Sequence, residues 1–393
     1  MAAPPPDPGD AFQLPSGLHY LNCAYMSPLP RSVEAAGIRG IRRKRVPSRI
    51  GSEDFFQECD ALRTRFARLV GSGESDRVAL LPAVSYGVAV VAKNAGSLQG
   101  RNVVVVRDQF PGNVYAWMEA ARSDGGELRI VDSPGPSAGH PGRGAGWTQR
   151  VLEAVDQDTA VVAMAPVHWT DGTRFDLEAV GHRCREVGAL FVVDGTQWVG
   201  AAPFSVDRVR PDALICAGYK WLLGPYSLAA GYFGARFDQG IPLEAGWITR
   251  AGSRDFASLV NYTDEYAPGA VRYDVGERSN FILVPMLLEA LRLVEAWSPE
   301  RVERHCRGLT DLMARPLAER GFGVEEREWR APHILGLTLP PEMDGNETRR
   351  TLEARRVQVS LRGSAVRVSP YLYNEPSDVE ALVEGLMEAL EGR

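Results

Sequence analysis

The amino-acid sequence predicts an α/β protein with a mostly parallel, seven-stranded sheet between helices, followed by a smaller α+β domain. Before about residue 235, short apolar and β-branched runs occur, and most are continuously apolar, as in strands covered on both faces. Helical patterns such as Asp176–Val187 and Val114–Arg122 separate many of these runs, which favours parallel strands. The expected strands are Arg77–Val84, Asn102–Arg107, Glu127–Val131, Ala160–Val167, Leu190–Asp194, Ala213–Ala217 and Leu228–Phe233.

The pattern changes beyond about residue 280. Long amphipathic helical patterns appear there together with isolated strand-like pieces, a mixture that indicates a separate α+β layer. We therefore expect a large domain over residues 16–280, with the N-terminal segment packing near the active site, and a small domain over residues 281–393. The expected helices are Val284–Trp297, Pro299–Glu319 and Asp378–Leu390, and the expected strands are Val324–Trp329, His333–Leu339, Val357–Leu361 and Ala365–Val368.

Two segments are expected to lack regular structure. Residues 1–15 begin with the Pro-rich, acidic stretch MAAPPPDPGD, which has neither the basic nor the apolar region of a signal peptide. We expect this segment to be a flexible tail. Residues 132–147, DSPGPSAGHPGRGAGW, are rich in Gly, Pro and Ser and predict a long loop inside the large domain.

Composition excludes several classes of function. A formal net charge of −6 leaves no basic excess to follow a nucleic-acid backbone, and no apolar run approaches the ~20 residues of a membrane helix. Five cysteines without a CxxC pair predict free thiols and a reducing, cytoplasmic location. The six histidines are scattered without metal-ligand spacing, so no metal site is expected.

Lys220 is the first candidate catalytic residue. It follows an apolar strand in the stretch ALICAGYKWLLGPY. Lysine is rarely buried without a functional reason, and burial beside positive charge lowers its pKa and makes the amine nucleophilic toward an aldehyde. Taken alone, a lysine after a strand is more often structural or surface-facing.

Three more residues suit one cofactor chemistry. Asp194 ends the strand in ALFVVDGTQW, and a carboxylate there suits a protonated pyridine nitrogen. Gln197, three residues on, is the candidate for a ring oxygen. Ser85 opens a helical pattern in LLPAVSYGV, where a hydroxyl and unpaired N–H groups suit a phosphate. Taken singly, Asp194 and Ser85 fit a helix N-cap better.

The order of these residues carries a resemblance. A phosphate turn, an Asp after a middle strand and a Lys about 26 residues later resemble class V of the fold-type I enzymes that depend on pyridoxal 5′-phosphate (PLP). This group includes cysteine desulfurases, kynureninase and isopenicillin N epimerase. The resemblance runs from about Leu21 to the C-terminal helix, and D-x-x-Q with G-Y-K is its most specific element. It implies the fold-type I transferase fold, PLP bound to Lys220 and a homodimer with shared active sites.

The resemblance implies further cofactor-binding residues on two loops. In DQFPGNVYAW, Phe110 takes the position of the residue that stacks on the pyridine ring, where desulfurases have His. In APVHWTDGTRFD, Asp171 falls where many members have Asn, and Thr170 is the alternative. For both loops a structural role, such as a core Phe, is the plainer alternative.

Besides Ser85, two further residues are candidates for the phosphate. Tyr219 precedes the lysine as in kynureninase and is a plausible phosphate ligand, whereas Ala217 stands where the family often has Ser. The segment VGERSNF resembles the stretch whose hydroxyl reaches the phosphate of the partner subunit, which makes Ser279 the candidate.

The substrate α-carboxylate is assigned to an arginine near the C-terminus. In SLRGSAVRVSPYLYN, Arg367 aligns best with the family arginine, and Arg362 is the second choice. A guanidinium suits a carboxylate because it donates two parallel hydrogen bonds. Asn22 in the N-terminal segment is a further candidate for the substrate pocket.

The resemblance implies a reaction on an amino acid through an external aldimine and abstraction of the Cα proton by Lys220. We expect an aminotransferase first, then a lyase (β-elimination or kynureninase-like cleavage) or an epimerase, and more remotely a non-catalytic PLP-binding module. A desulfurase is not expected, because no cysteine occurs between Gly308 and Arg393. A nucleotide-dependent Rossmann enzyme would need a GxGxxG turn, and the sequence has none.

Overall fold

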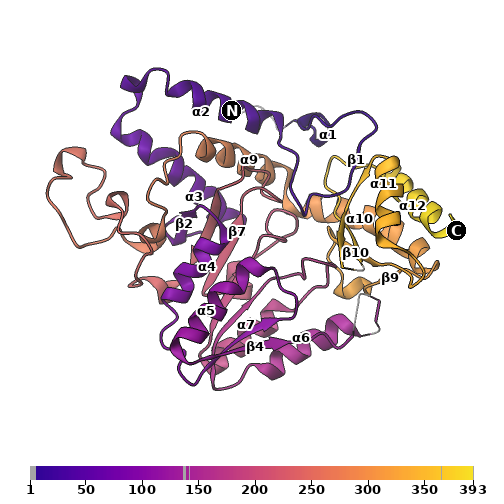
Figure 1. Ribbon diagram of the computed structural model, residues 1–393. Helices are drawn as coiled ribbons and strands as arrows, with labels where there is room; N and C mark the ends of the chain where they lie inside the picture. The colour runs from indigo at the N-terminus through magenta and orange to yellow at the C-terminus, as the bar shows by residue number, and fades with distance from the viewer. Residues whose placement is uncertain (1–5, 136–138, 141, 364, 393) are drawn as a thin grey trace.

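The computed structural model describes residues 6–135, 139–140, 142–363 and 365–392 (Figure 1). Its large domain is built on a seven-stranded sheet in the order β2-β8-β7-β6-β5-β3-β4. Strand β8 is antiparallel to both of its neighbours, and every other pair in this sheet is parallel. The mostly parallel seven-stranded sheet is therefore confirmed. The strands are β2 Val78–Leu81, β3 Asn102–Val106, β4 Glu127–Val131, β5 Thr159–Met164, β6 Leu190–Asp194, β7 Ala213–Ala217 and β8 Ala229–Phe233.

Helices cover both faces of this sheet, which explains why the strands are continuously apolar. Alternate residues of one strand enter different cores: Val103 packs with α4 and α5 on one face, whereas Val104 packs with α3, α6, α7 and α9 on the other. The edge strand β4 is the exception, and most of its residues are partly exposed. The helices are α3 Gln57–Leu69, α4 Val84–Lys93, α5 Tyr115–Asp124, α6 Arg143–Ala154, α7 Leu177–Val187 and α9 Leu283–Trp297.

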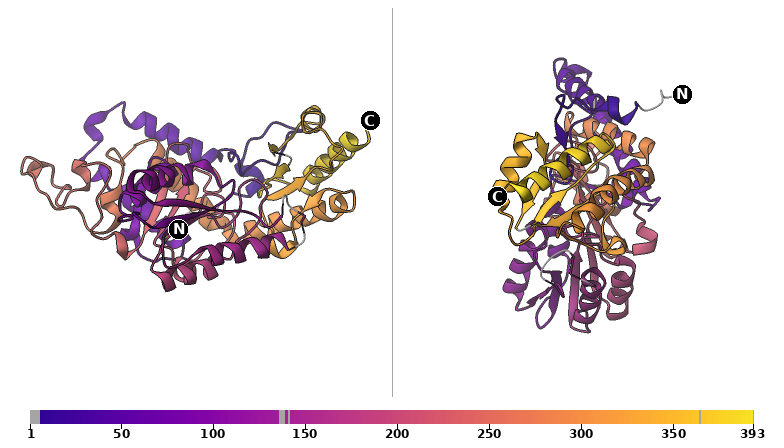
Figure 2. Two further views of the ribbon diagram at one scale, coloured as in Figure 1. Left: turned by 60° about the horizontal axis from the view of Figure 1, so that its bottom comes forward. Right: turned by 90° about the vertical axis from the view of Figure 1, so that its right-hand side faces the viewer.

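The small domain lies at one end of the molecule (Figures 1 and 2). It contains an antiparallel sheet in the order β12-β13-β10-β9, and its core packs helices α10 and α12 against these strands. Strand β11 (Val357–Gln358) pairs with β1 (His19–Tyr20), so the N-terminal segment extends this domain. The elements are β9 Gly323–Val324, β10 Leu335–Thr338, β12 Ser360–Arg362, β13 Ala365–Val368, α10 Pro299–Ala318, α11 Gly345–Ala354 and α12 Pro376–Glu391.

The structure differs from the expected pattern in several respects. Helix α9, expected at the start of the small domain, packs in the core of the large domain, and the strand expected over Val324–Trp329 is limited to β9. Helix α1 (Pro8–Ala11) forms and Phe12 is buried, so the expected flexible tail is wrong for residues 8–12, whereas residues 1–5 lie outside the described ranges. The expected loop over residues 132–147 ends early, because α6 begins at Arg143 behind Gly142, whose φ of +69° suits glycine. Helix α11 was not expected; it is strongly polar, and only Thr348 and Leu352 are buried.

The parallel strands bring the chemically interesting residues to one edge of the sheet. Strands β6 and β7 are parallel neighbours, so their carboxyl ends, followed by Gly195 and Gly218, meet there. Strand β2 runs in the same direction, because it and β7 are both antiparallel to β8. The N-terminus of α4 therefore opens at this edge as well. In open α/β sheets this is the edge where ligands bind.

Among the described residues, no helix is both long enough and apolar enough to cross a membrane.

Phe12 anchors the N-terminal segment on the rest of the molecule. Its ring contacts Tyr373, Trp297 and Tyr371, with centroids 4.9, 5.9 and 6.2 Å away. We predict that Phe12→Ala lowers the free energy of unfolding by about 3 kcal/mol, because a buried aromatic side chain is replaced by a cavity. Denaturant unfolding measures this change, with Leu312→Ala at an exposed helix position as the control. A change as small as that of the control would mean that the segment is not anchored.

Candidate active site

A cavity of about 260 Å³ opens at the carboxyl edge of the large sheet. It lies where β6, β7 and the start of α4 meet, so the parallel strand order creates it. Six residues singled out by the sequence line it together: Ser85, Phe110, Asp194, Gln197, Tyr219 and Lys220.

Lys220 is 6% exposed and lies in the turn after β7. Burial lowers the pKa of its amine to about 8; the carboxylate of Asp194 opposes this shift, and Arg367 and Arg362 add to it. The Nζ atom lies 5.4 Å from the ring centre of Phe110. A large part of the amine is thus neutral near pH 8, as nucleophilic attack on an aldehyde requires.

Asp194 is a buried carboxylate at the end of β6. Its Oδ1 atom accepts a hydrogen bond from the Thr196 N–H at 3.0 Å, and no described lysine, arginine or histidine forms an ion pair with it. Burial raises its pKa. A desolvated carboxylate facing a cavity fits a cationic ring N–H as its partner.

Gln197 has a side-chain amide whose orientation is determined by its neighbours. The indole Nε1 of Trp221 donates to Oε1 at 2.9 Å, and Nε2 donates to the carbonyl of Ala24 at 2.9 Å. Because an indole N–H can only donate, Oε1 must face Trp221. One N–H of Nε2 is left for the cavity, where it suits an acceptor oxygen.

The other side of the cavity has the character of an anion site. Helix α4 has no side-chain cap at Ala83, and its first N–H groups have no partner within the helix. The exposed Ser85 is in its first turn. The ring of Tyr219 lies 4.6 Å from that of Tyr226, and both line the cavity. A helix N-terminus with neighbouring hydroxyls is a typical phosphate site.

Trp169 and His168 line the cavity but were not singled out for it by the sequence. The Trp169 ring meets Phe110 edge to face at 5.4 Å. His168 has hydrogen-bond partners at both ring nitrogens: Nε2 with the carbonyl of Arg107 at 3.1 Å and Nδ1 with the Thr170 hydroxyl at 2.7 Å. Both residues stand in the loop APVHWTDGTRFD, directly before Thr170 and Asp171.

Asp171 does not line the cavity. It is buried, and its carboxylate pairs with Arg143 at 2.8 Å while Arg143 also contacts Glu325 of the small domain at 3.2 Å. Burial acts to raise the pKa of Asp171, but His168 and Arg143 outweigh it, and the net pKa is lowered. The structure therefore places Asp171, and the Thr170 alternative, outside the cavity wall; Asp171 belongs to an ion-pair network between the two domains.

Arg367 is 1% exposed and lies beside Trp169, and it is not among the residues that line the cavity. It donates to the Trp169 carbonyl at 2.8 Å and to the Ser360 hydroxyl at 3.5 Å, its Nε has no partner, and it forms no ion pair with a described carboxylate. Burial, and then Arg362, lower its pKa to about 9. An unpaired buried cation of this kind suits a carboxylate ligand.

Two further candidates, Asn22 and Ser279, do not line the cavity. Asn22 accepts a hydrogen bond from Ser360 at 2.8 Å, which links it to Arg367 through that hydroxyl. The Ser279 hydroxyl donates to the carbonyl of Phe55, away from the cavity of its own chain. Within the described ranges, no cluster of three His, Cys, Asp or Glu side chains is arranged to hold a metal ion.

Comparison with known proteins assigns the class. The family model of class-V aminotransferases matches residues 48–382, so the chain belongs to this family. Isopenicillin N epimerase of Streptomyces clavuligerus is 26% identical over 390 residues, covering 95% of this chain and 94% of that protein. Kynureninase of Burkholderia mallei (strain SAVP1) is 25% identical over 401 residues, covering 97% and 91%.

The cysteine desulfurase CsdA of Escherichia coli has the same fold. The two structures superpose with a TM-score of 0.80 at 17% identity, covering 98% of this chain and 97% of that one. The fold is that of the fold-type I PLP-dependent enzymes, and the cofactor is PLP. The resemblance found in the sequence is thus confirmed.

The pKa of about 8 for Lys220 predicts a pH dependence in the cofactor-free protein. Because only the neutral amine attacks the aldehyde, about one-tenth of the molecules are reactive at pH 7 and about one-half at pH 8. The rate at which added PLP develops a visible absorption band should therefore rise about fivefold between these values and level off near pH 9. Lys220→Arg should develop no band. A rate that kept rising through pH 10 would indicate an ordinary, solvated lysine.

Proposed function

We propose that this protein is an aminotransferase acting on an α-amino acid. The observation that carries the proposal is the proton-handling set of the cavity. Among the described residues, two basic side chains line the cavity, Lys220 and His168. Both ring nitrogens of His168 have hydrogen-bond partners, so Lys220 is the base that is available for proton transfer. Moving an amino group needs one base on one face of the substrate, and Lys220 meets that need.

The residues of the cavity divide into four groups by the part of PLP that they would hold. Asp194 would pair with the pyridine nitrogen of PLP, and Gln197 would donate its remaining N–H to the ring oxygen. Phe110 would pack on the ring face. Ser85 and Tyr219, with the N-terminus of α4, would hold the phosphate. The proposal is supported by the convergence of all of these on one cavity.

PLP supplies an electron sink that makes the Cα proton of a bound amino acid acidic. Lys220 then takes that proton on Nζ, and burial favours the neutral amine that is needed for the transfer. Arg367 would bind the α-carboxylate and so orient the Cα–H bond. His168 lies close, but both of its ring nitrogens already have hydrogen-bond partners, so it is a positioning residue rather than a second base.

A persulfide-forming desulfurase is not part of the proposal, despite the likeness in fold to CsdA. All five cysteines are free and buried, and none lines the cavity of the described chain. Burial raises the pKa of each thiol, and a reactive thiol needs the opposite. Free thiols also suit a reducing compartment such as the cytoplasm.

A lyase is the second candidate. The likeness to kynureninase over nearly the whole chain favours it. Elimination or Cβ cleavage needs the same α-proton step by Lys220. An epimerase would need a second proton donor on the opposite face, and the described cavity wall offers only hydroxyl groups and the bonded His168 for that role.

A homodimer with shared active sites is also proposed. The segment from Ile241 to Tyr262 carries five of the most exposed large apolar side chains, and Tyr262 is 98% exposed. Part of it extends from the large domain, away from the small one (Figures 1 and 2). Such an exposed apolar segment is typical of an interface. Ser279, bonded away from its own cavity, would serve the partner's phosphate site.

To separate transamination from elimination, the holoenzyme is incubated with single amino acids and no acceptor. Transamination predicts stoichiometric conversion of the visible band into pyridoxamine phosphate together with one equivalent of keto acid. Pyruvate and ammonia released over many turnovers would instead show β-elimination, and alanine released over many turnovers would show kynureninase-like cleavage. Lys220→Ala is the control and should form neither product, because the proton-moving amine is gone.

The dimer proposal makes its own prediction. A double change of Val260→Glu and Tyr262→Glu places two charges on the exposed segment and should convert the dimer into monomers with weaker PLP binding. Sedimentation velocity measures the mass, and Leu312→Glu on the exposed face of α10 is the matched control. A wild-type protein that is monomeric at micromolar concentration would rule out the shared site.

A further inference from the structure

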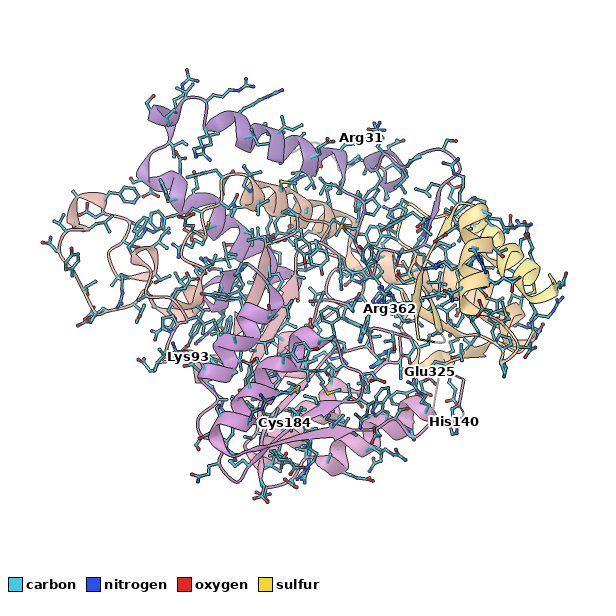
Figure 3. All side chains as sticks on the ribbon, in the orientation of Figure 1. Arg31, Lys93, His140, Cys184, Glu325 and Arg362 are labelled. Atoms are coloured by element: carbon cyan, nitrogen blue, oxygen red, sulfur yellow. The ribbon has the colours of Figure 1, made fainter. Side chains whose placement is uncertain are left out.

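A second cavity adjoins the Lys220 cavity. The two share three wall residues, Gln109, His168 and Trp169, but Lys220 and Asp194 line only the first, and Arg362 lines only the second. Figure 3 shows Arg362 close to where the large and small domains meet. A substrate seated at Lys220 therefore has a neighbouring space that its side chain can enter.

The arginines of the second cavity differ in one respect. Arg107 pairs with Asp132 at 2.6 Å, and Arg143 pairs with Asp171 at 2.8 Å. Arg362 has no carboxylate partner in the described chain; its Nη1 donates to the carbonyl of Leu361 at 2.9 Å, and its buried Nε has no partner at all.

The other acidic residue on the wall, Asp108, is exposed. It forms no ion pair with Arg362 in the described chain, and Asp132 is already paired with Arg107. The positive charge of Arg362 thus remains uncompensated. Arg362 is half-buried, its Nε atom is enclosed, and it lacks a carboxylate partner among the described residues, so an anionic ligand suits it.

Arg362 and Arg367 lie against the same indole ring. The guanidinium carbon of Arg362 lies 5.5 Å from the ring centre of Trp169, and that of Arg367 lies 5.9 Å from the same ring. Both arginines come from the paired strands β12 and β13. The two cations are therefore held on one indole, near enough for a single small molecule to reach both.

We propose that the second cavity is a subsite for an anionic group at the end of the substrate side chain, with Arg362 as its ligand. The substrate class is then an amino acid with a second carboxylate. This inference rests on the proposed function, in which Arg367 takes the α-carboxylate. Two anionic groups would neutralise the two arginines that have no carboxylate partner.

The test compares acidic amino acids with their amides, which have the same shape without the charge. Glutamate and aspartate should convert the visible band of the holoenzyme at least tenfold more efficiently, as kcat/KM, than glutamine and asparagine. Arg362→Gln should lower kcat/KM for the acidic substrates by about 10- to 100-fold and so remove the preference, because a charge-assisted hydrogen bond is lost.

Two further variants separate the roles of the arginines. Arg367→Gln should lower kcat/KM for acidic and amide substrates by similar factors, since both carry an α-carboxylate. Arg107→Gln alters an arginine of the same cavity that already has a carboxylate partner, and it should keep the preference for acidic substrates. Equal losses for both substrate types in Arg362→Gln would overturn the proposal, because Arg362 would then serve the α-carboxylate.

A binding measurement keeps this inference distinct from the proposed reaction. Glutarate has two carboxylates and no amine. Calorimetry of the holoenzyme should give a Kd for glutarate at least tenfold lower than the Kd for its monoamide. Arg362→Gln should abolish the difference. If no amino acid forms pyridoxamine phosphate but this difference is present, the aminotransferase proposal fails and the anion subsite stands. If wild-type protein binds the two ligands equally, the subsite is overturned.

Discussion

The active site depends on one electrostatic arrangement, a buried amine and a buried carboxylate at the same edge of a parallel sheet. Lys220 and Asp194 are both withdrawn from water, which lowers the pKa of the amine and raises that of the carboxylate. Each shift alone favours the neutral form, and each group's attraction for the other opposes it. The parallel pairing of β6 with β7 maintains this balance, because it brings the two strand ends together.

The arginines extend the same principle. Arg367 is more deeply buried than Lys220 and has no carboxylate partner, and its charge, with that of Arg362, contributes to the lowered pKa of the lysine. Leaving a cation unpaired in the interior is costly for stability. Such a cost is tolerated at sites where a ligand supplies the missing charge. The small domain thus acts on the lysine chemistry although its core is separate.

Trp169 links these parts of the site. Its ring contacts Phe110 on the cofactor side and lies beside both arginines on the other, and its indole N–H donates to the carbonyl of Asp108 at 2.8 Å. Trp169 is therefore part of the wall of both cavities. The sequence pattern did not single it out, since an aromatic residue in a loop is usually read as core.

The sequence by itself determined the seven strands, the order of Ser85, Asp194 and Lys220, and the family. These follow from local apolar patterns and motif spacing, which can be recognised without knowing how the chain packs. Tertiary structure alone decided that Asp171 pairs with Arg143 and that Phe12 is anchored in an aromatic cluster. Those outcomes depend on contacts between segments far apart in the chain, and burial and charge pairing are properties of the packed molecule. The second cavity beside Arg362 was likewise decided by tertiary structure, since it forms where the two domains meet.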